Sequence, residues 1–135
     1  YQVNCTFYDA LGRNDQDYLL ARAVQFFAPG VPQIYYVGLL AGGNDMALLA
    51  KSGIGRDINR HYYPAEEIDQ ALQRPVVQSL FELIHFRNQH PAFDGVFSLL
   101  ETEESEMILR WDNGTAWAIL EVDFSSGSYR ISSSP

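Results

Sequence analysis

A short glycine-jointed segment holds the densest group of side chains that could bind a ligand. Residues 53–63 read GIGRDINRHYY. Sugars present hydroxyl groups and weakly apolar C–H faces, so a sugar site needs fixed donors and acceptors beside aromatic walls. Arg56 would supply donors, with Asp57 and Asn59 as supporting groups, and a guanidinium can also bind phosphate or carboxylate through two hydrogen bonds. From residue types alone, the segment could equally be a loop tied down by its own charges.

Other sequence motifs that carry chemistry are missing. There is no Gly-rich phosphate loop, His-Glu-x-x-His, cysteine pair or Gly-x-Ser-x-Gly. The histidines lack metal-ligand spacing, so we expect no metal site. Close acidic pairs such as Glu66 and Glu67 lie at expected helix starts or turns, where negative charge favours the helix dipole or faces water. Tyr1 and Gln2 could suit a hydroxylated ligand, but on residue types alone they decide nothing.

The charge balance argues against polyanionic partners. The formal net charge is -8, from 17 acidic and 9 basic residues, and Lys51 is the single lysine. Without a concentrated basic patch we expect neither nucleic-acid nor membrane-surface binding. No apolar run approaches the ~20 residues that span a bilayer. One cysteine, Cys5, fits a reducing compartment, so we expect a cytoplasmic protein. Because the sequence starts at Tyr1 without an initiator methionine, we also expect a fragment.

Two kinds of periodicity predict the elements that position these residues. Apolar residues at helical spacing from Leu19 to Phe27 predict a helix that Pro29 and Gly30 end. The apolar and aromatic run 31–37 predicts a parallel strand covered on both faces. The Gly-rich stretch 38–63 then predicts a long irregular loop, with one helical turn at 45–50. In α/β barrels such loops follow the strands and carry the sites.

The rest of the chain changes from helical to strand periodicity. Pro75 inside an apolar helical pattern divides it into a short helix that ends near Arg74 and a longer one from Pro75 to about Asn88. After Pro91 the period becomes two. The expected strands are 96–100, 107–111, 117–122 and 129–132, with a hairpin turn at 112–114. We therefore expect two domains, 1–91 and 92–135.

A family resemblance gives this pattern a meaning. Residues 27–38 (FAPGVPQIYYVG) resemble the last helix-to-strand unit of the α-amylase superfamily barrel. Val37 precedes the glycine, and Leu39 replaces the acidic residue that often follows, as in the sucrose phosphorylases of glycoside hydrolase family 13. The similarity to that family is dense over residues 1–93 and loose beyond. It includes the segments 1–8 (YQVNCTFY), 18–23 (YLLARA), 55–63 (GRDINRHYY) and 74–77 (RPVV).

The resemblance implies a fold and a reaction. The expected fold is α/β, the C-terminal part of a (β/α)8 TIM barrel followed by a small antiparallel β-domain. The family transfers glucose with retention, from sucrose to phosphate, giving glucose 1-phosphate and fructose. Its nucleophile Asp, acid/base Glu and stabilising Asp should lie upstream, so no catalytic residue is expected in this chain. Carried over by position, Arg56 holds the glucosyl ring, whereas Tyr1 and Gln2 line the acceptor subsite.

Several alternatives remain open. The parent protein could be a related phosphorylase or an α-glucosidase with another acceptor, or the chain could be a non-catalytic carbohydrate-binding module. The expected partners are a small sugar and inorganic phosphate, with no metal or organic cofactor, and a homodimer of the full-length protein is left open. An unclosed barrel leaves strand edges and apolar faces uncovered. We therefore expect residues 1–135 alone to be inactive and to fold poorly.

Overall fold

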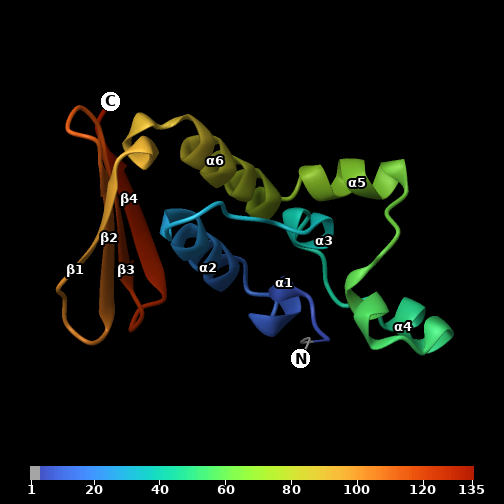
Figure 1. Ribbon diagram of the computed structural model, residues 1–135. Coiled ribbons are helices and arrows are strands. Elements are labelled where there is room, and N and C mark those ends of the chain that lie inside the picture. Colours follow the sequence, from blue (N-terminus) through green and yellow to red (C-terminus); the bar gives the residue numbers. More distant parts are fainter. Residues whose placement is uncertain (1–3) are drawn as a thin grey trace. The chain divides into compact units, whose positions relative to one another are not determined.

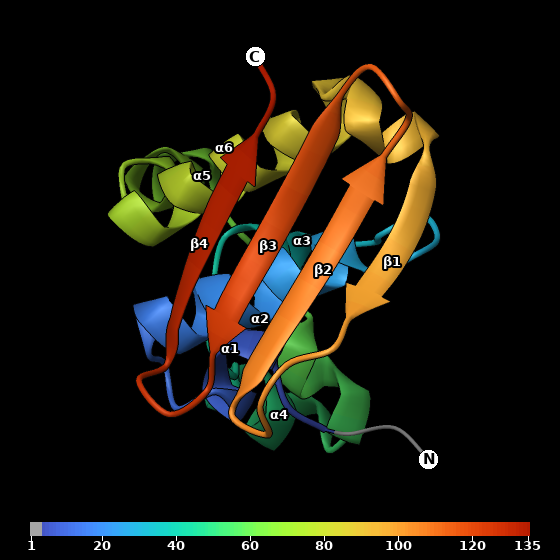
Figure 2. The ribbon, with the colours of Figure 1, turned by 90° about the vertical axis from the view of Figure 1, so that its left-hand side faces the viewer.

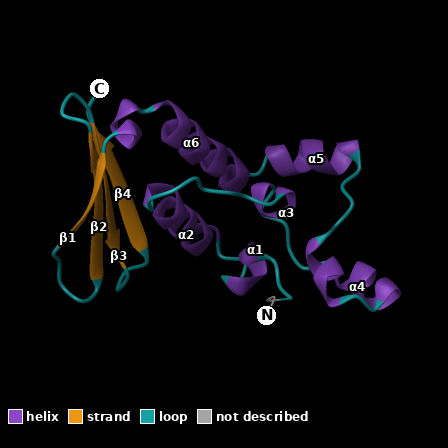
Figure 3. Ribbon diagram, in the orientation of Figure 1, coloured by secondary structure: helices purple, strands orange, loops and turns teal. Residues whose placement is uncertain are grey.

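The computed structural model describes residues 4–135. In chain order, helices come first and an antiparallel sheet follows (Figures 1 and 3). The described chain forms two compact units that interleave along the sequence, 4–18 with 33–79, and 19–32 with 80–135. Tyr1 and Gln2, expected at the acceptor subsite, lie outside the described residues.

Short helices and the first turns of the two longer helices make up the first unit. They are α1 (Phe7–Ala10), the start of α2 (Asp15–Phe27), α3 (Tyr36–Leu39), α4 (Met46–Ser52), the 3₁₀ helix η1 (Gly55–Asn59), α5 (Ala65–Leu72) and the start of α6 (Pro75–Gln89). Tyr18 is fully buried, and its hydroxyl donates to the Gly38 carbonyl. Phe7 and Tyr8 pack edge-on against its ring, at centroid distances of 5.7 and 5.3 Å. This aromatic cluster fixes α1 and α3 around the start of α2.

The structure contradicts the parallel strand expected at residues 31–37. The chain is irregular up to Tyr35, and Tyr36 already begins α3. Val31 is 89% exposed and Tyr35 51% exposed, so the run is not covered on both faces. A parallel strand forms only beside a neighbour that satisfies its backbone. Residues 4–135 contain no such neighbour, because every strand among them belongs to the later antiparallel sheet. Within this chain the architecture is thus helices followed by an antiparallel sheet.

The expected helices are confirmed. Residues 15–27 form α2, and Pro75 is the first residue of α6. A proline is tolerated at this position because the backbone N–H of a first helical residue has no partner within the helix. The single turn expected at 45–50 is α4, whose end is set by Gly53 at φ 67°, a conformation that glycine tolerates best. The Gly-rich stretch is therefore more ordered than the sequence predicted, with α4 packed against η1.

The second unit contains the sheet. Four antiparallel strands follow η2 (Pro91–Asp94) in the spatial order β1-β2-β3-β4, as Figure 2 shows. Their bounds are β1 (Val96–Leu100), β2 (Glu106–Asp112), β3 (Trp117–Asp123) and β4 (Ser128–Ser133). The four expected strands are confirmed to within one residue at each end. Alternate residues of β3 are buried (Ala118, Leu120 and Val122), which is the period of two that predicted the strand.

One buried hydrogen bond joins the sheet to α2 inside this unit. The Trp111 Nε1 donates to the Phe27 carbonyl over 2.7 Å. That carbonyl lies in the last turn of α2, where carbonyls have no partner within the helix. The domain boundary expected near residue 91 remains a prediction. No helix of residues 4–135 is both long and apolar enough to cross a bilayer.

Candidate functional site

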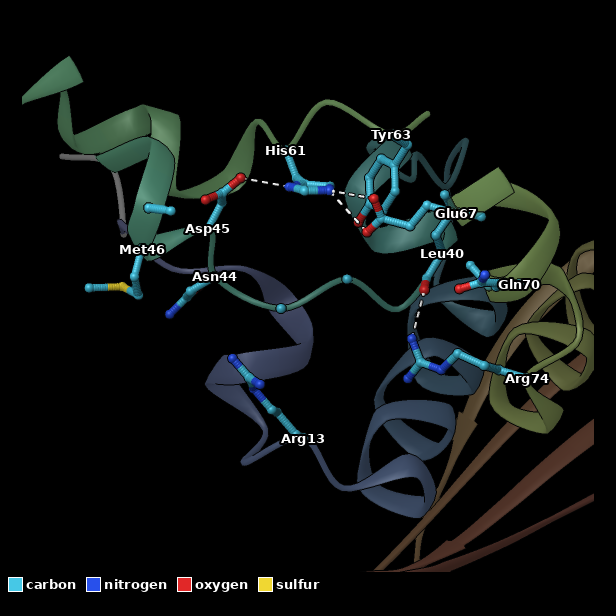
Figure 4. A pocket seen from close by; sticks show the side chains of 14 residues that line it. Arg13, Leu40, Asn44, Asp45, Met46, His61, Tyr63, Glu67, Gln70 and Arg74 are labelled. Atoms are coloured by element: carbon cyan, nitrogen blue, oxygen red, sulfur yellow. Dashed lines mark hydrogen bonds and ion pairs between the residues drawn. The ribbon is translucent and has the colours of Figure 1, made fainter. Parts of the chain in front are cut away.

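A polar cavity of about 650 Å³ opens in the first unit (Figure 4). Its lining comes from residues 40–47, from the segment after η1, and from α5 with the turn that follows it. The side chains that matter for chemistry are Asp45, His61, Tyr63, Glu67 and Arg74. Both signs of charge therefore face one cavity.

His61 bridges two carboxylates at this cavity. Its Nδ1 lies 2.6 Å from Asp45 Oδ2, and its Nε2 lies 3.0 Å from both carboxylate oxygens of Glu67. Figure 4 shows the ring between the two acids, one from the residue before α4 and the other from α5. The Tyr63 ring packs edge-on against the imidazole, 4.5 Å between centroids. The histidine thus links three separate parts of the chain.

The electrostatics of the bridge follow from these contacts. Hydrogen bonds to Glu67 and then to Asp45 raise the pKa of His61 above its ordinary value. The pKa of Asp45 is lowered, first by the Leu48 N–H that its side chain accepts as a helix cap and then by His61. The bridge is therefore arranged for an imidazolium between two anions.

A backbone contact and an aromatic hydroxyl form another part of the wall. Arg74 donates from Nη1 to the carbonyls of Leu40 and Ala41, at 3.1 and 3.0 Å. Gly42 leaves room for Tyr63, because a Cβ there would meet the phenol oxygen at 2.1 Å. Burial raises the pKa of Tyr63, so its hydroxyl stays neutral as a donor or acceptor.

A charged pair holds the opposite end of the cavity. Arg13 and Asp9 form two hydrogen bonds, 2.9 and 3.1 Å long. Arg13 first and then the Asn44 backbone N–H lower the pKa of Asp9. The Asn44 side chain in turn accepts from the Thr6 N–H over 2.7 Å. The loop that lines the cavity is thus anchored at α1.

The predicted sugar-binding residues lie next to this cavity in sequence but do not line it. Arg56, Asp57 and Asn59 share η1, where Arg56 is exposed. Asp57 is 3.6 Å from Arg60 and is not paired with its neighbour Arg56. Among residues 4–135, the side chains of Arg56 and Asn59 make no hydrogen bond or ion pair. The geometry leaves Arg56 available for a ligand, and its role remains a prediction.

Sequence reasoning missed the group that the structure brings together. Glu67 was expected to serve only the start of its helix, and Asp45 only to begin a helical turn. His61 was expected to bind no metal, because the histidines lack metal-ligand spacing. In residues 4–135 no group of three or more His, Cys, Asp or Glu side chains is placed to hold a metal ion. The sequence signal that could have found the bridge is an acid at a helix cap followed by a histidine and a second acid.

The arrangement can bind and orient polar groups. The cavity offers charged donors, carboxylate acceptors and a phenol, which suit a hydroxylated ligand. Both carboxylates of the bridge are already engaged by His61. The acid pair that glycoside transfer uses is expected upstream of this chain, and that placement remains a prediction.

Comparison with known proteins finds strong similarity over almost the whole chain. A sucrose phosphorylase from Agrobacterium vitis is 60% identical over 134 residues, which is 99% of this chain and 28% of that protein. A glucosylglycerol phosphorylase from Marinobacter adhaerens is 52% identical, over 97% of this chain and 27% of that protein. No protein-family model matches the chain. The chain spans a little over a quarter of the length of these relatives.

Solved structures agree with the sequence comparison. The crystal structure of sucrose 6F-phosphate phosphorylase from Thermoanaerobacter thermosaccharolyticum superposes with a TM-score of 0.96 at 45% identity. That similarity covers 98% of this chain and 27% of the other. The chain therefore has the fold of part of a glycoside phosphorylase.

Proposed function

Because this chain is homologous over nearly its whole length to the sucrose phosphorylases of glycoside hydrolase family 13, we propose that it forms the C-terminal part of a phosphorylase that transfers glucose from sucrose to phosphate. The observation that carries this proposal is 60% identity over 99% of the chain. Residues 1–91 would complete a (β/α)8 barrel supplied mainly by the rest of the protein. Residues 92–135 would form the small antiparallel domain.

The proposed reaction is balanced without an oxidant or a cofactor. The C1–O bond between glucose and fructose breaks, and fructose leaves with a proton from the acid. A carboxylate nucleophile holds the glucosyl group until a phosphate oxygen forms the new C1–O bond, and the acid is restored. The two displacements retain the configuration at C1. These acids would lie outside this chain, so residues 1–135 would contribute binding and positioning.

Arg56 is the proposed contact to the glucosyl ring. Two observations support it: η1 is fixed by packing against α4, and the exposed guanidinium is unpaired among residues 4–135. A guanidinium held by its backbone can donate to two sugar hydroxyls at once. Asp57 and Asn59 would steady η1. Tyr1 and Gln2 are proposed to line the acceptor side, on the family resemblance alone.

The names of the relatives differ in the group that is joined to glucose, so the substrate is the least determined part of the proposal. Their printed names include phosphorylases of sucrose, sucrose 6F-phosphate and glucosylglycerol. All of them are phosphorylases, so a phosphate acceptor is better supported than water. We propose sucrose first, because the 60% identical relative bears that name.

The test is an assay of the full-length protein with and without inorganic phosphate. Sucrose with phosphate should yield equal amounts of glucose 1-phosphate and fructose, whereas omitting phosphate should leave only slow hydrolysis to free glucose. Glucosylglycerol, glucosylglycerate and sucrose 6F-phosphate are tested in parallel. Preference for one of these moves the proposal to that substrate. Equal rates with and without phosphate would make the protein a hydrolase and contradict it.

A further inference from the structure

Asp45 is the first residue of the segment 45–61, which carries Arg56, and it contacts later residues of the same segment. The Asp45 N–H donates to the Ile58 carbonyl over 2.8 Å, and its side chain caps α4 through the Leu48 N–H at 2.7 Å. The other carboxylate oxygen lies 2.6 Å from His61 Nδ1. Asp45 therefore contacts the start of α4 at Leu48 and the end of the segment at Ile58 and His61.

His61 joins this closed segment to the rest of the first unit. Its Nε2 faces both oxygens of Glu67 on α5, each at 3.0 Å. Its backbone carbonyl accepts from the Tyr36 hydroxyl at 3.0 Å, which ties it to α3. Figure 4 shows the ring reaching from the segment toward α5. Removing the ring would break both side-chain links of the segment end, one to Asp45 and one to Glu67 on α5, and would leave only the backbone contacts of Ile58 and His61.

We propose that the His61 imidazolium is a protonation-dependent clasp, which holds residues 45–61 in the conformation that presents Arg56 and so supports binding of the glucosyl donor. The link to the donor rests on the proposed function, through Arg56. The clasp itself depends only on the described contacts. His61 touches no reacting group in this proposal and acts as a positioning residue.

The proton requirement follows from the geometry. Each ring nitrogen faces a carboxylate, and only a doubly protonated imidazole can donate from both nitrogens. The neutral ring would turn one lone pair toward an anion, so one of the two contacts would be lost. The two acids raise the pKa of His61, as expected for a clasp that stabilises the charged form. Its contribution is fully present below the unfolded value of about 6.5 and is lost as pH rises through the raised folded value.

The neighbouring groups do not supply this pH dependence. The other titratable or charged side chains beside His61 in the chain or around its cavity are Arg13, Tyr36, Arg60, Tyr62, Tyr63 and Arg74. Arginines stay charged throughout the working range. Burial raises the pKa of Tyr36 and of Tyr63, which keeps both neutral there. Near neutrality the group that changes charge is His61.

Three variants of the full-length protein separate the clasp from a general packing role. In His61→Gln one amide can donate to one acid but brings no charge. In His61→Arg a permanent cation can donate to both acids, and the bordering cavity of about 650 Å³ gives the longer side chain room. His85→Gln is the matched control, because His85 is exposed on α6 and makes no hydrogen bond or ion pair among residues 4–135.

Two readouts are compared at pH 6 and pH 8.5. The first is amide hydrogen exchange of peptides within 45–61, corrected for intrinsic rates, with β2 and β3 as the internal reference. The second is KM and kcat for the glucosyl donor at saturating phosphate, each variant being compared with the unmodified protein at the same pH. The exchange readout does not depend on any activity.

The clasp predicts a specific pattern. In the unmodified protein and in His85→Gln, 45–61 should be protected at pH 6, and this protection should fall as the pH rises through the raised pKa of His61. His61→Gln should be unprotected at both values, and His61→Arg protected at both. At pH 6 His61→Gln should raise KM about tenfold, with a much smaller change in kcat, as expected for losing one charge-assisted hydrogen bond. His61→Arg should bring KM back toward the original value.

Each other outcome contradicts a defined part of the proposal. Normal protection in His61→Gln at both pH values would overturn the clasp, whatever the kinetics. Loss of protection that extends equally to β2 and β3 would show global destabilisation and would also overturn it. Loss confined to 45–61 with unchanged KM would support the clasp but overturn the role given to Arg56, which is where the proposed function would fail.

Discussion

Arg87 brings a charge into the aromatic core of the second unit. Its guanidinium carbon lies 4.3 Å from the Phe93 ring centroid and 5.4 Å from that of Trp111. One terminal nitrogen donates to the Gly30 carbonyl over 3.2 Å. Burial lowers the pKa of Arg87, yet an arginine remains protonated at neutral pH. The ring faces and the charge of Asp94 together stabilise the guanidinium, whose planar group stacks on aromatic rings better than a lysine does.

Trp111 gives a residue-scale prediction about stability. Trp111→Phe removes the indole N–H that reaches the Phe27 carbonyl at 2.7 Å and leaves that buried acceptor unpaired. We expect the free energy of unfolding to fall by about 1–3 kcal/mol for the lost partner, with a further loss from the smaller ring. Denaturant unfolding of the full-length protein, followed through exchange of β2 peptides, measures it.

The matched control is Trp117→Phe in the same sheet. The Trp117 ring is only half-buried and makes no hydrogen bond among residues 4–135. The same substitution there should cost less than the change at Trp111, because no buried acceptor is abandoned. Equal losses at the two positions would mean that ring volume decides the stability and that the hydrogen bond contributes little.

At the scale of elements, the entry to β1 depends on close backbone contact. Gly95 precedes the strand with φ -99°, which any residue can adopt. A Cβ there would meet the Asp112 carbonyl oxygen at 2.2 Å and the Asn113 nitrogen at 2.6 Å. These are backbone atoms of the neighbouring strand and turn, so no side-chain rotation relieves the clash. The hairpin closes only because this position carries no side chain.

Gly95→Ala should therefore separate β1 from β2. We expect a loss of about 3 kcal/mol or more, the upper range for overpacking, measured as the unfolding free energy together with exchange in β1. Gly114→Ala in the turn between β2 and β3 is the control. Gly114 has φ +85° and nothing within 4 Å of its Cβ position, so only the conformational cost of roughly 1–2 kcal/mol applies. A smaller effect at Gly95 than at Gly114 would contradict this account.

Local patterns predicted the elements whose partners lie inside the chain. The strands of the sheet follow from their period of two, and Pro75 correctly marks the break between α5 and α6. The run at 31–37 has the composition of a buried strand, but burial is a property of neighbours. Residues 4–135 supply no neighbouring strand for it, so residues 31–35 stay irregular, with Val31 and Tyr35 exposed, and Tyr36 begins α3. The prediction of a strand at 31–37 was wrong for this chain, because an apolar run forms a buried strand only where neighbouring strands pair with it.

The candidate site was harder to predict for a related reason. Each acid is already explained by its place in a helix. Glu67 lies in the first turn of α5, and Asp45 caps α4. Only the three-dimensional path brings both to His61. The segment 53–63 was correctly singled out as polar and aromatic. Its histidine, for which the sequence predicted no role, bridges Asp45 and Glu67.

At the scale of the whole molecule, the chain exposes many large apolar side chains for its length. Val31 is 89% exposed, Tyr62 79%, Met46 58% and Tyr35 51%. Exposed apolar surface of this kind is often covered by a partner surface. Because the chain spans 28% of the length of a 60% identical relative, we expect the remainder of the protein to cover part of it.

The isolated chain should therefore associate with itself. Sedimentation velocity of residues 1–135 should show oligomers that grow with concentration, since self-contact is the available way to bury this surface. Replacing Val31 and Tyr35 together by serine should shift the distribution toward monomer. The comparison pair is Val96 and Leu99 on β1, 72% and 65% exposed, also replaced by serine. These lie on β1, an edge strand that already pairs with β2 along one side, so the shift should be smaller. A monomer at every concentration of the unmodified chain would contradict the expectation. An equal shift from both pairs would show that exposed apolar side chains in general drive the association, and not the segment around residues 31–35.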